Sequence, residues 1–153
     1  MLEVLIVLAI LGIVVLIAAD SFRGMGEKYR VEGEAKQMYA DLMDARGRAM
    51  QRSRATFVRF TGTGYRTVED TFPAPDGTGT LTAADTPITS VTVRHAITAA
   101  LPGDLDFRRD GTATVTGHIR LSSSARPDYD CVGIGITRLY LGKYNGTNAC
   151  IEK

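Results

Sequence analysis

The sequence has no lysine or arginine before Arg23, and its first 19 residues carry a single charge, at Glu3. A secretory signal peptide begins with a basic segment, so this absence argues against one, although Leu16–Ala18 and Ile17–Ala19 offer small-residue cleavage sites. The net charge is also small, because 18 basic residues face 17 acidic ones, and this argues against a polyanion as the main partner. Aromatic residues make up 7% of the chain and do not repeat along the predicted helix, which gives electron conduction through stacked rings little support.

Motifs typical of enzymes are also missing. His95 and His118 lie in predicted strands without a serine or cysteine nucleophile signature nearby, and a histidine in a strand is more often structural than a base. The sequence has no phosphate-binding glycine loop and no His-Glu pair of the metalloprotease kind. Cys131 and Cys150 stand 19 positions apart without histidine neighbours, which does not match a zinc pattern. We therefore expect no catalytic activity, no metal and no cofactor.

What the chain does have is an apolar run over residues 1–19. As a helix this run is about 28 Å long, close to the hydrocarbon thickness of a bilayer, so we expect it to cross a membrane once. A carboxylate near the end of such a helix costs several kcal/mol unless it is paired. Glu3 therefore predicts a partner, and the free amino terminus of another copy of the chain fits that role. An ordinary single-span anchor would leave Glu3 unexplained.

The helical pattern continues to residue 54. From Glu34 onward, apolar or small residues recur at spacings of three or four and form one stripe of a helix. The stripe consists of Ala35, Met38, Leu42, Ala45 and Ala49. We expect residues 1–54 to form one helix, amphipathic over 20–54, whose stripe is buried against a β-rich head over 55–153.

Beyond Arg54 the pattern changes to alternation, which indicates strands. Residues 55–60 and 65–69 predict a hairpin, and residues 72–90 predict a long loop that is either mobile or used in packing. Asp110–Gly111, between alternating runs at 105–109 and 112–116, predicts a second hairpin. Further strands are expected at 91–95, 118–121, 132–136 and 139–141. The chain shows no repeat of 20–50 residues, so the expected class is α+β.

Three segments resemble one known family. Met1–Ile13 is similar to the amino-terminal signature of type IV pilins and type II secretion pseudopilins, an apolar helix with one glutamate near its start. Residues 45–49 match an Ala-Arg-x-x-Ala motif at the helix end, and Phe107–Gly111 matches a Phe-x-x-Asp-Gly hairpin. Both motifs resemble the pseudopilin H and minor-pilin (FimT-like) group. The resemblance implies a type IV pilin-like fold, with a long helix packed on a head of two small antiparallel sheets.

The resemblance also implies a function. Such chains are structural subunits of a pilus or pseudopilus filament. They stay in the inner membrane until a prepilin peptidase and an assembly platform process and extract them, and they end in a periplasmic or cell-surface filament. The peptidase removes a short basic leader and the new amino terminus is methylated. In the family the glutamate is the fifth mature residue, whereas here it is the third residue given. Either two residues precede Met1, or cleavage falls two residues later; we favour the first.

Three residues are expected to act in assembly: Glu3, Met1 and Gly12. In assembled filaments of the family the helix commonly unwinds between a glycine, matched here by Gly12, and a proline, replaced here by Asp20. Without the proline the local reason for unwinding is weaker, although glycine alone costs a helix about 1 kcal/mol relative to alanine. We expect some loosening over residues 12–20 in a filament.

Export of the head would place Cys131 and Cys150 in an oxidising compartment. An even number of cysteines there favours a disulfide over two free buried thiols, with a stabilisation of roughly 3 kcal/mol in the chain-entropy model.

The resemblance also allows a second function, which is capture of DNA by the head, as in some relatives of the minor-pilin group. Four arginines crowd the predicted helix end, Arg46, Arg48, Arg52 and Arg54. Arg59 follows them, and a looser basic set lies at Arg126, Arg138, Lys143 and Lys153. Cations at a helix end also complement its dipole, which is the simpler interpretation.

Overall fold

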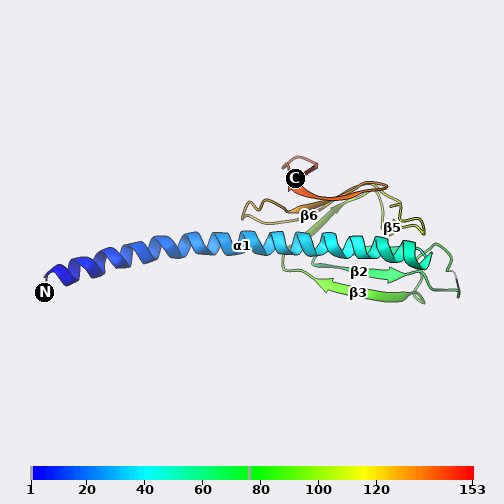
Figure 1. The fold of residues 1–153 in the computed structure, drawn as a ribbon, viewed down its shortest axis with the longest axis horizontal. Coiled ribbons are helices and arrows are strands. Elements are labelled where there is room, and N and C mark those ends of the chain that lie inside the picture. Colours follow the sequence, from blue (N-terminus) through cyan, green and yellow to red (C-terminus); the bar gives the residue numbers. More distant parts are fainter. Residues whose placement is uncertain (1, 76) are drawn as a thin grey trace.

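A computed structural model describes residues 2–75 and 77–153, apart from the side chains of residues 2, 5, 9 and 16–23. One long helix is followed by two antiparallel sheets, which confirms the predicted α+β class. The helix α1, Leu2–Arg52, extends along the whole molecule, and its first part projects away from the sheets (Figure 1).

The second part of α1 is helical because its apolar stripe is buried. Ala35, Met38, Leu42, Ala45 and Ala49 are each at most 1% exposed, as the spacing predicts. The helix ends at Arg52 rather than at residue 54, since Ser53 has a φ of 52°, a left-handed conformation that stops an α-helix.

The first sheet has the strand order β3-β2-β1-β5. Its strands are β1 (Thr56–Thr61), β2 (Gly64–Glu69), β3 (Thr86–Thr92) and β5 (Leu105–Phe107). Thr61 pairs with Gly64 across a tight turn, so the hairpin predicted after the helix is present.

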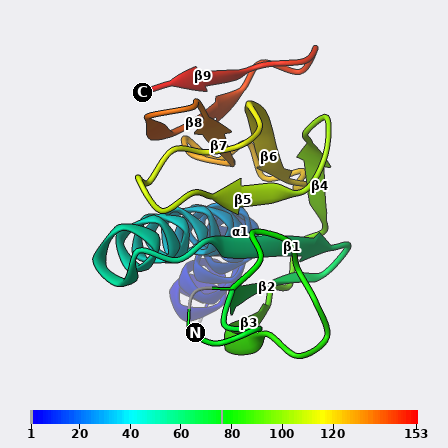
Figure 2. The same cartoon turned by 90° about the vertical axis from the view of Figure 1, so that its right-hand side faces the viewer.

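The second sheet has the order β4-β6-β7-β8-β9. Its strands are β4 (Ile97–Ala100), β6 (Gly117–Leu121), β7 (Cys131–Ile134), β8 (Leu139–Tyr144) and β9 (Cys150–Glu152). Viewed from the end of the helix, the two sheets lie on different sides of α1 (Figure 2).

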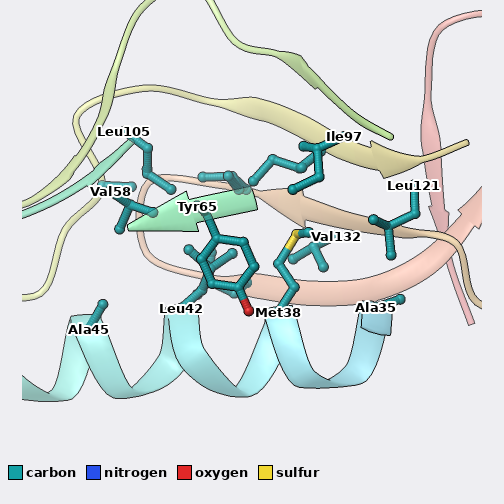
Figure 3. Close-up of a cluster of buried hydrophobic side chains, with 14 of the residues drawn as sticks. Ala35, Met38, Leu42, Ala45, Val58, Tyr65, Ile97, Leu105, Leu121 and Val132 are labelled. Carbon is teal, nitrogen blue, oxygen red and sulfur yellow. The ribbon is translucent and has the colours of Figure 1, made fainter. Parts of the chain in front are cut away.

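The core lies between the helix stripe and the inner faces of both sheets. Figure 3 shows Met38 and Leu42 directed toward Val58 and Tyr65 of the first sheet and toward Val132 of the second. Tyr65 remains polar at its tip, where its hydroxyl donates a 2.6 Å hydrogen bond to Asp41 on the helix. One continuous core therefore joins the helix to both sheets.

Three strand predictions were wrong in part. Strand β3 begins at Thr86, inside the predicted loop, because pairing with β2 tolerates Pro87 at a sheet edge. The Asp110–Gly111 turn forms, but residues 112–116 make a single bridge, Phe107 to Ala113, and β5 pairs with β1 instead. His95 lies in a bend after β3 rather than in a strand.

The remaining loop between β2 and β3 is held by two buried carboxylates. Asp85 accepts hydrogen bonds from the backbone N–H groups of Thr71, Phe72 and Thr82 at 2.6–3.0 Å. Asp70, which is fully buried, accepts hydrogen bonds from the N–H groups of Thr78 and Gly79. This loop is therefore packed, one of the two alternatives that its length suggested.

Within the described residues, no helix combines the length and hydropathy needed to cross a membrane. The predicted span over residues 1–19 includes residues whose side chains fall outside that description. The membrane span over residues 1–19 therefore stays a prediction.

Candidate functional site

The candidate assembly site is the first part of α1. Glu3 lies in the first turn of the helix and is exposed, a position where the helix dipole favours a negative charge. Among the described residues it has no hydrogen-bond or ion-pair partner. Met1, its predicted companion in assembly, lies outside the described residues.

The side chains around Glu3 leave a large apolar surface. Nine apolar residues, which follow one another too closely to form a single stripe, are 51–62% exposed. They are Val4, Ile6, Val7, Leu8, Ile10, Leu11, Ile13, Val14 and Val15. Soluble monomers rarely expose contiguous apolar surface of this kind, so it marks a contact with protein or lipid.

Gly12 lies inside this surface. The helix is continuous from residue 12 to residue 20, and a Cβ added at Gly12 would meet no other atom within 4 Å. The loosening predicted for a filament concerns the assembled state, and a single chain does not test it.

The four arginines at the helix end do not form one site. The guanidinium of Arg48 bonds Asp44, with 2.6 Å between Nε and Oδ2. Arg52 and Arg54 both pair with Glu69, at 2.9 and 3.2 Å, and the Glu69 side chain is only 4% exposed. The Nε atom of Arg46 is buried without a hydrogen-bond partner.

Glu69, at the end of β2, was not singled out from the sequence. Its ion pairs with two arginines link the helix end to the first sheet. Burial of an unpaired carboxylate would be strongly unfavourable, and the two guanidinium groups offset that cost. No local pattern in the sequence indicates this role, because Glu69 stands 17 and 15 positions from the two arginines that it binds. The pairing directs the guanidinium groups of Arg52 and Arg54 toward Glu69, although the Arg52 side chain is still 56% exposed.

A second tie joins the helix to the segment after β6. The Lys28 Nζ atom lies 2.7 Å from an Asp128 oxygen, and Lys153 lies 3.3 Å from the other. The backbone N–H of Asp128 donates a 2.8 Å hydrogen bond to Glu32. These contacts position the segment that precedes β7, and nothing in the local sequence predicts them.

Cys131 and Cys150 form a disulfide in the structure. It joins the first residues of β7 and β9, two strands that flank β8. Gly142 of β8 allows this, because a Cβ there would approach the Cys150 sulfur to 2.9 Å. The disulfide therefore fixes the carboxy-terminal strand to the sheet.

Among the described residues, no cluster of three or more His, Cys, Asp or Glu side chains could hold a metal ion. A hollow of about 520 Å³ beside β5 is lined by Phe57, Phe107, Arg108 and Asp110 among others, and its lining includes no histidine, cysteine or serine.

Comparison with known proteins gives one match. The sequence model of a family described as type II transport protein GspH matches residues 34–137, more than half of the chain. The match begins at Glu34, at the start of the buried helix stripe, and ends in the turn after β7. No match was found among curated proteins or among solved structures.

Proposed function

Because the chain belongs to the type II transport protein GspH family of pseudopilins, we propose that it is a structural subunit of a pseudopilus-like or type IV pilus-like filament. The observation that carries this proposal is the contrast along α1. Its head-bound part buries the stripe from Ala35 to Ala49, whereas its projecting part exposes nine described apolar side chains between Val4 and Val15, close to Glu3. Such a surface is suited first to lipid and then to the same helices of other subunits.

In this proposal, residues 1–19 hold the subunit in the inner membrane until a prepilin peptidase and an assembly platform act on it. The helices then stack in the core of the filament, which lies in the periplasm or at the cell surface. Head-to-tail packing of identical surfaces is open, so the filament grows without a fixed length. Other pseudopilins of the same machine are further partners.

Glu3 sets the axial register. In the dry interior of a helix bundle, its carboxylate would neutralise the free amino terminus of a neighbouring subunit. A buried polar pair of this kind selects one alignment, because any other leaves both charges unpaired. Gly12 lies in the same packed region and leaves a neighbouring helix room to approach.

We expect Glu3→Gln to abolish or strongly reduce filament yield in a shearing assay, while the head folds normally. Asp44→Asn is the matched control, because it also removes one exposed acid from α1 but lies beside the head. Normal filament yield from Glu3→Gln would contradict the role assigned to Glu3.

DNA capture by the head remains an alternative without support from these contacts. Arg48 is paired with Asp44, and Arg52 and Arg54 share the carboxylate of Glu69, so each of the three guanidinium groups already has an internal partner.

A further inference from the structure

His95 is nearly buried between the head and the helix, with 7% of its side chain exposed. It lies in the bend after β3, and each of its ring nitrogens meets a carboxylate of α1. Nε2 lies 2.8 Å from Glu27, and Nδ1 lies 2.8 Å from Glu34. Glu27 and Glu34 are about two helical turns apart and share one face, so the ring bridges them.

The geometry requires a particular protonation state. A neutral imidazole has one N–H donor, whereas an imidazolium has two. Since both ring nitrogens of His95 lie within hydrogen-bonding distance of carboxylate oxygens, both contacts are favourable only for the imidazolium. Loss of the proton would turn one contact into a repulsion between two lone pairs.

The backbone contributes to the same contact. Glu34 also accepts hydrogen bonds from the backbone N–H groups of Arg94 and His95, at 3.1 and 3.3 Å. One carboxylate therefore holds both the ring and the chain that carries it. We call Glu27, His95 and Glu34 the histidine clasp.

Other charged groups surround the clasp. Arg30 from the helix and Arg94 from the bend act on Glu27, and Tyr65 from β2 lies near enough to Glu34 to be affected by its charge. Tyr65 stays protonated, because burial and its hydrogen bond to Asp41 raise the pKa of its hydroxyl. Histidine is the side-chain type that ordinarily changes charge near neutral pH, so His95 is the group of the clasp that does so.

The clasp lies where the helix leaves the head. Val31 is the first buried residue of the apolar stripe, and residues 24–26 before the clasp are exposed. We propose that the histidine clasp is a proton-dependent fastener that fixes helix residues 27–34 to the head. When His95 loses its proton, this segment is partly released: the burial of Val31 and the Lys28–Asp128 pair still hold it, and the core around Met38 and Leu42 stays folded.

The direction of the pH dependence follows from the contacts. Burial alone lowers the pKa of His95, but hydrogen bonds and charges from Glu27 and Glu34 outweigh it and raise the pKa above the ordinary 6.5. The contribution of the clasp is therefore complete below pH 6.5 and is lost as the pH rises through the higher folded-state value. On the acid side, the hydrogen bond from His95 is the main cause that lowers the pKa of Glu27 below 4.5, so the clasp persists in moderately acid solution.

The test is an NMR titration of the histidines in the full-length chain in a nonionic detergent. His118 is an internal reference, because burial and the charge of Arg120 lower its pKa. We expect His95 to titrate above 6.5 and His118 below it. Titration of His95 at or below 6.5 would overturn the proposal.

Hydrogen exchange on the same sample tests the release. Above the His95 midpoint, the amide protection factors of residues 27–34 should fall roughly tenfold, as expected from the loss of one charge-assisted hydrogen bond, while those of residues 41–49 stay constant. Unchanged protection over 27–34 across the midpoint would overturn the release.

Two variants distinguish the loss of the clasp from a general loss of stability of the head. His95→Gln should give low protection over residues 27–34 at every pH, whereas the matched His118→Gln should keep the pH dependence. If His95→Gln does not fold, Glu27→Gln serves instead, because Glu27 is partly exposed and only one arm of the clasp is removed. It should lower the His95 midpoint, and an unchanged midpoint would refute the pairing. All these measurements use the single chain, so their outcome is independent of whether filaments form.

Discussion

The two parts of α1 contain similar apolar residues and have opposite surroundings. Between Val4 and Val15 the described apolar side chains are more than half exposed, whereas from Val31 to Ala49 the stripe is at most 1% exposed. The difference comes from the head, since both sheets cover only the second part (Figure 1). The head stabilises half of its own helix and leaves the other half for a partner.

This comparison separates folding from assembly. Burying one aliphatic side chain contributes about 1.5–3 kcal/mol, whether the partner surface is in the same chain or in another. In the stripe from Ala35 to Ala49, this burial stabilises the folded subunit. The projecting part keeps it available for lipid or for other helices, so changes in the two parts should have different consequences.

The largest expected effect is on the folding of the head. Leu42→Ala should lower the free energy of unfolding by about 2–5 kcal/mol, because it removes a 1% exposed side chain from a closed core. The same change at Leu11, which is 53% exposed, should leave the unfolding of the head within about 0.5 kcal/mol of the wild type. Urea unfolding followed by circular dichroism and tyrosine fluorescence measures both.

The Leu11→Ala change should have its effect on filament yield instead of on the unfolding of the head. Leu11→Ala should reduce assembly of a well-folded subunit, since the lost methyl groups belong to the proposed helix–helix contact. Equal destabilisation of the head by both variants would break the comparison, because it would mean that the projecting part also contributes to the fold.

The sequence predicted the parts that depend on local pattern. The helix stripe at Ala35, Met38 and Leu42 follows from the 3.6-residue period, and the β1–β2 hairpin from alternation around a tight turn. The second arm expected after Gly111 forms only one bridge to β5, at Ala113, whereas β5 pairs on its other edge with β1, far away in sequence. Alternation shows which residues can form a strand but not which strand they will pair with.

The candidate site was predicted unevenly for the same reason. Glu3 and Gly12 are visible in the sequence because they interrupt an apolar run. The roles of Glu69 and His95 depend on side chains that meet across 15 to 68 positions of sequence. The arginines at the helix end are recognisable as a cluster, and the i, i+4 spacing predicts the pair of Asp44 with Arg48. Glu69, which pairs with Arg52 and Arg54, was not predicted.

A smaller effect is expected from the glycines of the two helix parts. Gly33 and Gly12 both have space for a Cβ, since an added atom meets nothing within 4 Å at either position. Gly33→Ala should raise the free energy of unfolding of the head by about 0.5–1 kcal/mol, because alanine restricts the unfolded chain and favours helix. Gly12→Ala should leave that value unchanged.

Gly12→Ala instead tests the assembled state. If the helix loosens near residue 12 in a filament, this variant should assemble less well or should show slower hydrogen exchange over residues 12–20 in filaments. Gly12→Ala filaments with wild-type yield and wild-type exchange would show that Gly12 has no special role in assembly.

The smallest effect is expected where the head-bound part of the helix makes an exposed ion pair. Arg48→Ala removes the bond to Asp44, whose side chain is 59% exposed, and should cost about 0.3–0.5 kcal/mol, less at high salt. The measurement is urea unfolding at low and at high ionic strength. Asp44→Asn is the matched control, because it breaks the same pair and should have a similar effect.

The same two variants also decide the DNA alternative. If the paired arginines are structural, neither variant should change the mobility of a DNA fragment mixed with the protein at low salt. If Arg48 contacted phosphates, Arg48→Ala would weaken binding and lower its salt dependence, whereas Asp44→Asn would strengthen it by freeing the guanidinium. Opposite shifts from the two variants would therefore show that the head binds DNA. They would also contradict the division of α1 into a part that assembles and a part that folds with the head.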